Sequence, residues 1–514
     1  MRTIVTHARR QPWLVVLATL CVLALAGEAV ATGTASHAVR DALAPYSHVH
    51  GVDGPRGSVT VAAGAQTATP GVKCGPRSRP ETGRQGRVPP AEYTSGRAAK
   101  GYTCNAVDVG HFGISGGYQV HRYVDSAGRE CAIYDGALIF GMNSPKGEAN
   151  GTFVLDMSDP ARPVRTAVLD TPGMASPHES LRLDATRGLL MAAAGSPTTQ
   201  VGFFDVYDLS EDCRHPVLRS SSPIALLGHE GGLSPDGRTY WATTTFASGI
   251  TAIDVSDPSL PRVLGRYDYH VHGMSISADG TRAYLADVYD GPTTNFVSAT
   301  TQGGGGMRIL DISEVQNRAP NAQVREVGRV TWPEVTIPQN TIPVTIKRRR
   351  YVIEFDEFDS NVYTYTPDEN VGGIRIIDVT NERRPKVVSR IRLEVWNRAA
   401  RVDQGDDPGA TTVGQGYAAH YCSVPRQVEP GMLACSAIAS GLRVFDIRDP
   451  RKPREVAYVN HPHVGGPDAE PAGAYAMSAP AFVPARREIW YSDVNTGFWS
   501  VRLTNGAWIG RGRR

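Results

Sequence analysis

Four histidines occupy equivalent places in four repeated segments of the chain, each just before a short run of apolar residues. They are His178 in SPHESLRLD, His229 in GHEGGLSPD, His272 in VHGMSIS and His420 in AAHYCSVP. Two of them are followed directly by acids, Glu179 and Glu230. Imidazole and carboxylate groups are good ligands for divalent transition metals. The pattern therefore predicts a site for one such metal, or for a polar ligand, if the fold gathers the repeats around a common centre.

A second set of acids stands at the end of the next strand pattern in three of the repeats. The set comprises Asp287 in YLADVYDG, Glu354 and Asp356 in VIEFDEF, and Asp493 in YSDVNTG. A strand that leaves the histidine end and a second strand that returns to it would bring these acids back to the same end of the fold. We therefore include all four carboxylates among the candidate ligand-binding residues.

The histidines also have a purely structural interpretation. Repeats arise by duplication, so a histidine shared by four copies can be one inherited residue that bonds a neighbouring backbone group. Three copies lack it and carry Gln339-Asn340, Met477-Ser478 or Gln119-Val120 near the equivalent place. Spacing within a repeat does not show that the imidazole rings point inward. A bound metal, a metal-free polar pocket and structural histidines are all open interpretations of the sequence.

The repeats are defined by a motif of glycine, apolar residues, aspartate and a proline-rich turn. It occurs as GTFVLDMSDPARP from Gly151, FFDVYDLSEDCRHP from Phe203, GITAIDVSDPSLP from Gly249, GMRILDISEV from Gly306, GIRIIDVTNERRP from Gly373 and GLRVFDIRDPRKP from Gly441. A degraded seventh copy, GFWSVRLTNG from Gly497, has Arg502 in place of the acid. We expect each aspartate to bond backbone amides in the turn that follows it, which is a structural role and not catalysis.

Each repeat has the pattern of four β-strands. In one copy the pattern covers residues 272–278, 282–288, 306–313 and 324–331, with Asp279-Gly280 as a turn signal. Seven such units predict an all-β protein, a seven-bladed β-propeller of four-stranded antiparallel blades. The last unit lacks a fourth strand, and residues 105–112 fit that role, so an N-terminal strand would close the ring. A ring of six blades with one irregular unit is the alternative.

The motif Gly-hydrophobic-x-hydrophobic-hydrophobic-Asp-hydrophobic-Ser-Asp-Pro-x-x-Pro resembles the LVIVD repeat of bacterial and archaeal secreted or surface proteins. The resemblance covers most of the chain from about Gly101 onward. It implies a β-propeller fold and a location outside the cytoplasm. It implies no reaction, and it assigns no catalytic residue to this chain.

The first 31 residues have the pattern of a secretory signal peptide. Arg2, Arg9 and Arg10 precede an apolar run from Trp13 to Ala26, and Ala29-Val30-Ala31 is a small-residue cleavage site. The apolar run is shorter than the ~20 residues that span a bilayer, so we expect no membrane span after cleavage. An uncleaved N-terminal anchor is the alternative.

Two segments follow the predicted signal peptide. Residues 32–100 are rich in glycine, proline, alanine, arginine and serine without sustained periodicity, which predicts a low-complexity, extended lead-in. Residues 101–514 are expected to form the propeller. We expect a secreted, extracellular protein, with association to the cell surface as a variant of that location.

Six cysteines follow the signal peptide, and no two have the C-x-x-C spacing of a zinc knuckle or a redox motif. Disulfides are the simpler interpretation for an exported chain. Cys422 and Cys435 fall on the first and second strands of one blade and are expected to bridge a hairpin. The other expected pairs are Cys131 with Cys213, in turns of adjacent blades, and Cys74 with Cys104, between the lead-in and the closing strand. Other connectivities for these four cysteines are open.

The composition and the absence of known motifs exclude several classes of function. The chain has 53 Lys and Arg against 51 Asp and Glu, so it has no overall field to attract nucleic acid or an anionic membrane. It contains no P-loop and no G-x-G-x-x-G dinucleotide fingerprint. We expect a monomer whose partner is a small molecule or a protein or cell-envelope ligand, and not nucleic acid.

The long insertions of the repeats fall at the same end as the histidines. They span Tyr289–Gly305, Glu357–Gly372, Val395–Tyr417 and Asn460–Ala474. Loops gathered on one face of a rigid scaffold commonly carry recognition. The leading hypothesis is a propeller that binds a ligand or partner through this loop-rich face at the channel mouth, without catalysis.

A metal-dependent enzyme, a hydrolase or an oxidase, is the alternative function. In that case the four histidines hold one divalent transition metal, and Glu179, Glu230 or Asp287 acts as acid–base or supports the ligands. A structural module of the cell surface is a third hypothesis.

Overall fold

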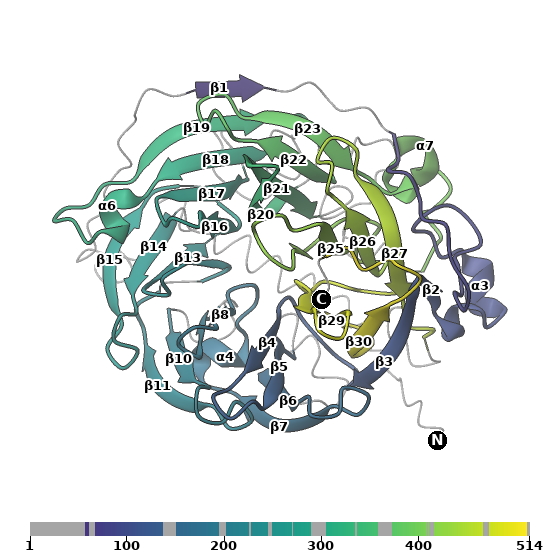
Figure 1. The fold of residues 1–514 in the computed structure, drawn as a ribbon, viewed down its shortest axis with the longest axis horizontal. Coiled ribbons are helices and arrows are strands. Elements are labelled where there is room, and N and C mark those ends of the chain that lie inside the picture. The colour runs from purple at the N-terminus through teal and green to yellow at the C-terminus, as the bar shows by residue number, and fades with distance from the viewer. Residues whose placement is uncertain are drawn as a thin grey trace, which may run out of the picture.

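The computed structural model describes residues 57–60, 67–136, 151–194, 202–225, 228–244, 249–269, 271–288, 305–334, 337–357, 373–408, 410, 416–465 and 472–510. These residues form a ring of seven antiparallel sheets (Figure 1). The predicted signal peptide and two of the four predicted insertions, at residues 289–304 and 358–372, lie outside the described residues. Every helix in the described part is short, and none of them is long and apolar enough to cross a membrane.

Each sheet is one blade, and the blades follow one another in chain order. Blade 1 contains β4 (Val120–Val124), β5 (Glu130–Asp135), β6 (Thr152–Asp156) and β7 (Val164–Leu169). Blade 2 contains β8 (Arg182–Asp184), β9 (Leu189–Ala193), β10 (Phe204–Asp208) and β11 (Val217–Ser222). Blade 3 contains β12 (Gly231–Leu233), β13 (Thr239–Thr244), β14 (Gly249–Asp254) and β15 (Arg262–Tyr267). Blade 4 contains β16 (Met274–Ile276), β17 (Arg282–Asp287), β18 (Gly306–Asp311) and β19 (Arg325–Thr331).

The remaining three blades complete the ring. Blade 5 contains β20 (Ile337–Ile346), β21 (Arg349–Glu357), β22 (Ile374–Asp378) and β23 (Lys386–Ile391). Blade 6 contains β24 (Cys422–Ser423), β25 (Met432–Ser436), β26 (Leu442–Asp446) and β27 (Arg454–Asn460). Blade 7 contains β28 (Ala481–Val483), β29 (Glu488–Asp493), β30 (Gly497–Leu503) and the early strand β3 (Ala106–Phe112).

The ring is closed by β3, which pairs antiparallel with the last strand, β30. Their register runs from Ala106 opposite Leu503 to Phe112 opposite Phe498. The predicted seven blades and the closing N-terminal strand are therefore confirmed, and the six-bladed alternative is wrong. Because this blade is built from both parts of the chain, its hydrogen bonds join the first blade to the last.

The middle strands of each blade are buried continuously, because the neighbouring blades cover both faces of the sheet. In β22, Ile374, Ile376 and Ile377 all have 0% exposure. The outer strand of blade 2, β11, carries no buried residue and begins with exposed Val217. This gradient explains why the third strand of each repeat is the most apolar, with β-branched residues that suit a covered sheet.

The motif aspartate organises the turn after each third strand. In blade 3, Asp254 Oδ1 accepts hydrogen bonds from the backbone N–H of Ser256 at 3.0 Å and from its hydroxyl at 2.6 Å. The same pair of bonds recurs at three other motif aspartates, Asp156, Asp208 and Asp311. The predicted structural role of this residue in the turn is confirmed.

The turn that this aspartate shapes contacts the next blade. Each outer strand has a register shift opposite its third strand, and the turn of the following blade packs there. The Ser220 hydroxyl in β11 donates to Pro258 O at 2.8 Å, and the Ser389 hydroxyl in β23 donates to Pro450 O at 2.6 Å. At the same place in β3, a Cβ on Gly110 would lie 2.0 Å from Pro160 O. The repeated motif thus joins blades as well as ending strands.

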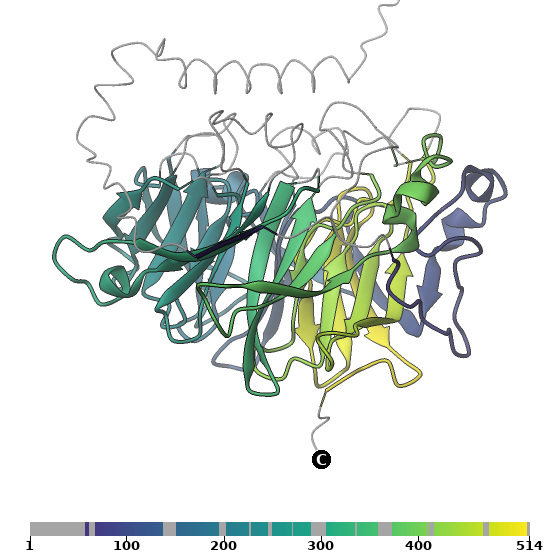
Figure 2. The same cartoon turned by 90° about the horizontal axis from the view of Figure 1, so that it is seen from above.

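The described part of the lead-in, residues 57–60 and 67–100, lies along the outer wall (Figure 2). Strand β1 (Gly57–Thr60) extends blade 4 by parallel pairing with β19, and β2 (Tyr102–Cys104) extends blade 6 beside β27. Two short helices, α3 (Pro90–Thr94) and η1 (Ala98–Lys100), lie between them in sequence. The other helices are α4 (Pro172–Ala175), α6 (Ser313–Gln316), η3 (Glu394–Trp396) and α7 (Arg398–Arg401).

Ionic contacts and disulfides fasten the lead-in and the blades. Buried Arg443 of blade 6 contacts Glu81 of the lead-in, and Arg87 Nε lies 2.8 Å from an Asp407 carboxylate oxygen. The disulfides are the three pairs expected from the strand map: Cys74–Cys104, Cys131–Cys213 and Cys422–Cys435. The second of these links blade 1 to blade 2, and the third bridges β24 and β25.

Replacement of the motif aspartate in blade 3, Asp254→Ala, should lower the free energy of unfolding by about 1–3 kcal/mol. The variant leaves the Ser256 amide without its acceptor, and it removes the carboxylate that lies 3.1 Å from Arg318. Chemical denaturation measures the change. The matched control is Asp268→Ala at an exposed aspartate after β15, where a change within about 0.5 kcal/mol is expected. Equal losses in the two variants would contradict the structural role of the motif.

Candidate metal centre at the propeller axis

The four predicted histidines lie at the entry to the innermost strands of blades 2, 3, 4 and 6. Three of them continue the backbone pairing two residues before the strand begins: His229 N donates to Thr243 O, His272 N to Ala286 O and His420 N to Ser436 O, at 2.8–3.0 Å. Because the innermost strands surround the axis (Figure 1), these residues converge there. The ring centroids of His178 and His229 are 4.3 Å apart, and those of His229 and His272 are 4.7 Å apart.

Glu179 lies at the centre of this group. Its Oε2 is 3.2 Å from His229 Nε2 and 3.3 Å from His272 Nε2, and its Oε1 is 3.4 Å from His420 Nε2. A second carboxylate, Glu357 at the end of β21, lies 3.5 Å from His420 Nε2 and 3.8 Å from His272 Nε2. We call the four histidines with Glu179 and Glu357 the axial centre.

Two histidines of the axial centre are oriented by the backbone of the next blade. His272 Nδ1 bonds Pro338 O at 3.1 Å, and His420 Nδ1 bonds Met477 O at 2.6 Å. A carbonyl oxygen only accepts, so Nδ1 carries the proton in both rings. Each ring therefore turns Nε2 toward the carboxylates, and Nε2 can bind a metal once it has lost its proton; a second bond at Nδ1 is the usual arrangement of metal-ligating histidines.

The spacing of the donor atoms fits one ion. Two sets, His178 with Glu179 and His229, and Glu179 with Glu357 and His420, each place all their ligand atoms within 4.8 Å of one another. Ligand atoms bound at about 2.0–2.2 Å to one zinc-sized ion lie roughly 3–3.5 Å apart. Nitrogen and carboxylate oxygen ligands suit zinc, copper, iron or nickel better than calcium or magnesium.

The electrostatics divide the histidines into two kinds. Burial alone lowers the pKa of His420, but Glu179 and Glu357 outweigh it and raise the pKa to about 9. His272 also has a raised pKa, because Glu179 outweighs its burial. Burial and the neighbouring His229 lower the pKa of His178 to about 3. Burial opposes the charge on Glu179, but the surrounding imidazoles, His272 first, hold its pKa well below its usual range.

The backbone at His178 is strained. Its φ is 53°, in the left-handed region that residues other than glycine rarely adopt. Its Nδ1 is buried and has no hydrogen-bond partner among the described residues, and it lies 3.9 Å from Glu179 Oε2. A strained residue with an unpartnered ring nitrogen is more common at a functional site than in a blade core.

A second polar layer, centred on Glu230, adjoins the axial centre. Glu230 Oε1 accepts hydrogen bonds from the Tyr421 hydroxyl and from Asn340 Nδ2, and Arg182 Nη2 lies 3.2 Å away. Burial, only partly offset by Arg182, raises the pKa of Glu230 to about 7. The residue therefore exchanges a proton near neutral pH, as a general acid or base does.

The other predicted acids have partners within their own blades. Asp287 accepts from Arg308 at 2.8 Å, and both Glu354 and Asp356 contact Arg375, at 2.8 and 2.7 Å. The structure thus pairs these three carboxylates with buried arginines and not with the imidazoles.

Asp493 holds the backbone at the end of β29. It accepts from Tyr475 N at 2.7 Å and from Asn495 N at 2.8 Å. Asp356 has a similar contact, because it also accepts from Gly373 N at 2.7 Å. The shared position of these acids at the end of the second strand therefore has a structural explanation.

Glu357 is the residue of the axial centre that the sequence interpretation missed. It follows Glu354 and Asp356 directly in VIEFDEF. Because side chains alternate along a strand, Glu354 and Asp356 lie on one face of β21 and Glu357 lies on the opposite face. That alternation was a usable signal, but nothing in the sequence says which face turns to the axis.

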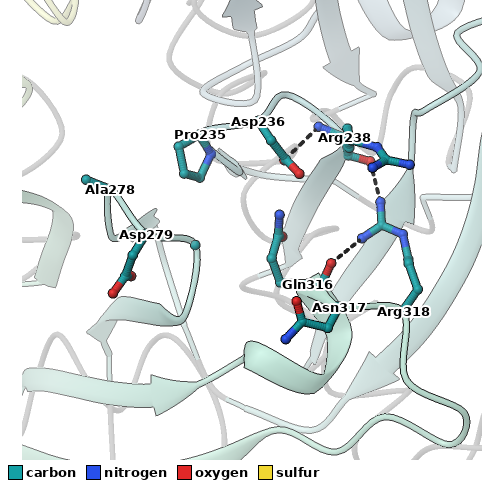
Figure 3. Close-up of a pocket in the computed structure, with 9 residues that line it drawn as sticks. Pro235, Asp236, Arg238, Ala278, Asp279, Gln316, Asn317 and Arg318 are labelled. Carbon is teal, nitrogen blue, oxygen red and sulfur yellow. Dashed lines mark hydrogen bonds between the residues drawn. The ribbon is translucent and has the colours of Figure 1, made fainter.

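A polar recess of about 600 Å³ lies at the opposite end of the ring, between blades 3 and 4 (Figure 3). Its lining includes Asp236, Asp279 and Arg318. Asp236 and Asp279 accept from the serines and amides of their own turns, and Arg318 pairs with Asp254 at 3.1 Å. The charged groups of the recess are therefore engaged in shaping turns.

Comparison with known protein families identifies one repeat motif in the chain. The LVIVD repeat family matches residues 245–269. This chain carries an LVIVD repeat. The matched segment is β14, its Asp-Pro turn and β15, and the earlier resemblance is confirmed to that extent. No curated protein matches this chain.

The solved structures that are similar to this chain include a hydrazine synthase and a gluconolactonase. Hydrazine synthase of Kuenenia stuttgartiensis has 12% identity and a TM-score of 0.47, over 76% of this chain and 97% of that chain. Periplasmic gluconolactonase of Pseudomonas aeruginosa has 14% identity and a TM-score of 0.45, over 71% and 91%. At these values we take neither substrate nor reaction from either protein.

In chelator-treated protein, a histidine with a raised pKa and a histidine with a lowered pKa should change the free energy of unfolding with pH in opposite directions. His420 binds a proton in the folded state up to about pH 9, whereas an unfolded histidine releases it near 6.5. The stability that this bound proton gives to the folded state is therefore complete below about pH 6.5 and is lost as the pH rises through about 9. Relative to His420→Gln, the wild type should lose stability across this window, as measured by denaturation at a series of pH values.

His121 of β4 is the control with the opposite sign. Burial lowers its pKa to about 4, so the unfolded state binds more protons between about pH 4 and 6.5. The wild type should lose stability relative to His121→Gln as the pH falls through that window. Parallel pH profiles for the wild type and both variants would contradict the assignment.

Proposed function

We propose that this propeller binds one divalent transition metal in the axial centre and presents it to a small polar ligand at the loop-bearing end. The observation that carries the proposal is the position of Glu179, whose carboxylate oxygens lie 3.2–3.4 Å from the Nε2 atoms of three histidines of three blades. Donors that converge in this way from distant parts of a chain are the usual form of a transition-metal site.

Burial and orientation of the donors support a bound ion over structural histidines. His420 Nε2 is buried and faces two carboxylate oxygens, 3.4 Å away on Glu179 and 3.5 Å away on Glu357, while its Nδ1 is bonded to the backbone. His178 Nδ1 has no hydrogen-bond partner among the described residues, and a buried nitrogen without a partner costs about 1–3 kcal/mol if its role is only structural. A metal in the centre would act as a Lewis acid toward its ligand.

Access to the centre is restricted, so the proposed ligand is small. His178 and His229 retain 8% and 7% exposure, while His272 and His420 have 1% and 0%. We therefore place the open side of the centre next to His178 and His229. The three disulfides support a role outside the cytoplasm, where such bonds persist.

Metal binding tests the proposal directly. Protein stripped with a chelator and dialysed against zinc, cobalt or copper, one at a time, should retain one ion per chain by elemental analysis. The double variant His272→Ala/His420→Ala should lose roughly 100-fold or more in affinity, because both rings are held by second bonds that orient them.

An exposed histidine supplies the matched control. His215 lies in the turn between β10 and β11, at the end of the ring away from the axial centre, and His215→Ala should bind the metal as the wild type does. A wild type without stoichiometric metal, or a double variant that binds as tightly as the control, would overturn the proposal.

Catalysis is the second candidate function, and Glu230 favours it. A carboxyl group with a pKa of about 7, buried beside the axial centre and bonded by Tyr421, can give up and regain a proton during hydrolysis or oxidation of a metal-bound substrate. In this role Glu230 is the acid–base group, and the positive charge of Arg182 stabilises its ionised form.

The second candidate is tested on metal-loaded protein. A panel of small esters reports hydrolysis, and oxygen uptake with small organic reductants reports oxidation. Glu230→Gln should keep the metal and lower any turnover about 100-fold or more, in line with loss of a general acid–base group. Turnover that survives this substitution would remove Glu230 from the proposed role, and a fully inactive, metal-loaded wild type would favour binding alone.

A further inference from the structure

Gln339 occupies the place in blade 5 that histidine occupies in other blades. In the pairing of β20 with β21, Pro338 opposes Asp356 and Asn340 opposes Phe355, so Gln339 is the extra residue of a bulge. Bulges of this kind re-aim side chains near functional sites.

Both neighbours of Gln339 contact the polar groups at the axis. Pro338 O accepts from His272 Nδ1, and Asn340 Nδ2 donates to Glu230. The backbone carbonyl oxygen of Gln339 also lies next to Gly273, because a Cβ built on Gly273 would be 2.5 Å from that oxygen. The backbone on either side therefore fixes Gln339 at the wall of the axial centre.

The side chain of Gln339 is buried without bonds. Its exposure is 0%, and neither Oε1 nor Nε2 has a hydrogen-bond partner among the described residues. Gln119, near the equivalent place in blade 1, is different, because its Nε2 donates to Glu179 O at 3.4 Å. An amide whose donor and acceptor are both unused is unfavourable in a protein interior unless something binds it.

We propose that Gln339 orients the non-protein ligand of the axial metal. Its carboxamide can donate from Nε2 and accept at Oε1, which suits a small ligand that presents an oxygen to the metal, such as a carboxylate or an alcohol. This inference rests on the proposed metal site. Gln339 is a ligand-positioning residue, and the metal itself is held by the imidazoles and the two glutamates.

Gln339→Leu tests the role, because leucine has a similar volume and no hydrogen-bonding group. In metal-free protein the variant should be at least as stable to heat as the wild type, since it removes an unsatisfied amide. Loaded with Co(II), whose visible absorption reports its ligands, the variant should bind the metal within about 3-fold of the wild type. Acetate, the probe ligand, should bind its cobalt roughly 5- to 10-fold more weakly.

Gln119→Leu is the matched control. It removes an amide that is bonded within the protein, so it should lower the thermal stability of the metal-free protein and leave acetate affinity unchanged. A similar loss of stability in Gln339→Leu would show that its amide is bonded inside the protein and would overturn the proposal.

The remaining outcomes separate this proposal from the metal site on which it rests. Uptake of Co(II) by the wild type, with equal acetate affinity in the wild type and Gln339→Leu, overturns the role of Gln339 and leaves the metal site in place. A wild-type cobalt spectrum that acetate does not change has the same consequence. A wild type that takes up no Co(II) overturns both.

Discussion

The antiparallel pairing of β3 with β30 is the constraint on which the rest of the structure depends. It joins residues near the start of the propeller to its last repeat and turns seven sheets into a closed ring. Closure covers both faces of every blade and leaves the innermost strands facing one another. The geometry of the axial centre follows from this closure, because its ligands come from five blades and no pair of adjacent blades holds more than a part of it.

The contacts that orient the histidines also cross from blade to blade. His272 of blade 4 is held by Pro338 of blade 5, and His420 of blade 6 is held by Met477, next to blade 7. Buried imidazoles and carboxylates are costly unless they are bonded or hold an ion. The centre is therefore stabilised by the same blade-to-blade packing that the Asp-Pro turns maintain at the other end of the ring.

The two ends of the propeller thus use polar residues differently. At the turn end, acids such as Asp254 and Asp236 accept from their own turns, and their bonding capacity serves the fold. At the axial centre, His178 Nδ1 and the Gln339 amide are buried without hydrogen-bond partners in the described part of the chain. Bonding groups left unused beside converging imidazoles and carboxylates are available to a ligand or an ion.

The sequence by itself determined the strand pattern, the seven repeats, the closing strand, the structural aspartate and the histidines at the strand entries. These features are local and repeat with a fixed period, so spacing and residue type suffice to find them. Only the tertiary structure decided that Glu357 and not Asp356 reaches the axis, and that Arg375 neutralises Glu354 and Asp356. The physical reason is that alternation along β21 separates Glu357 from Glu354 and Asp356, but which side meets the imidazoles depends on partners from other strands, such as Arg375 of β22, and no local pattern encodes them.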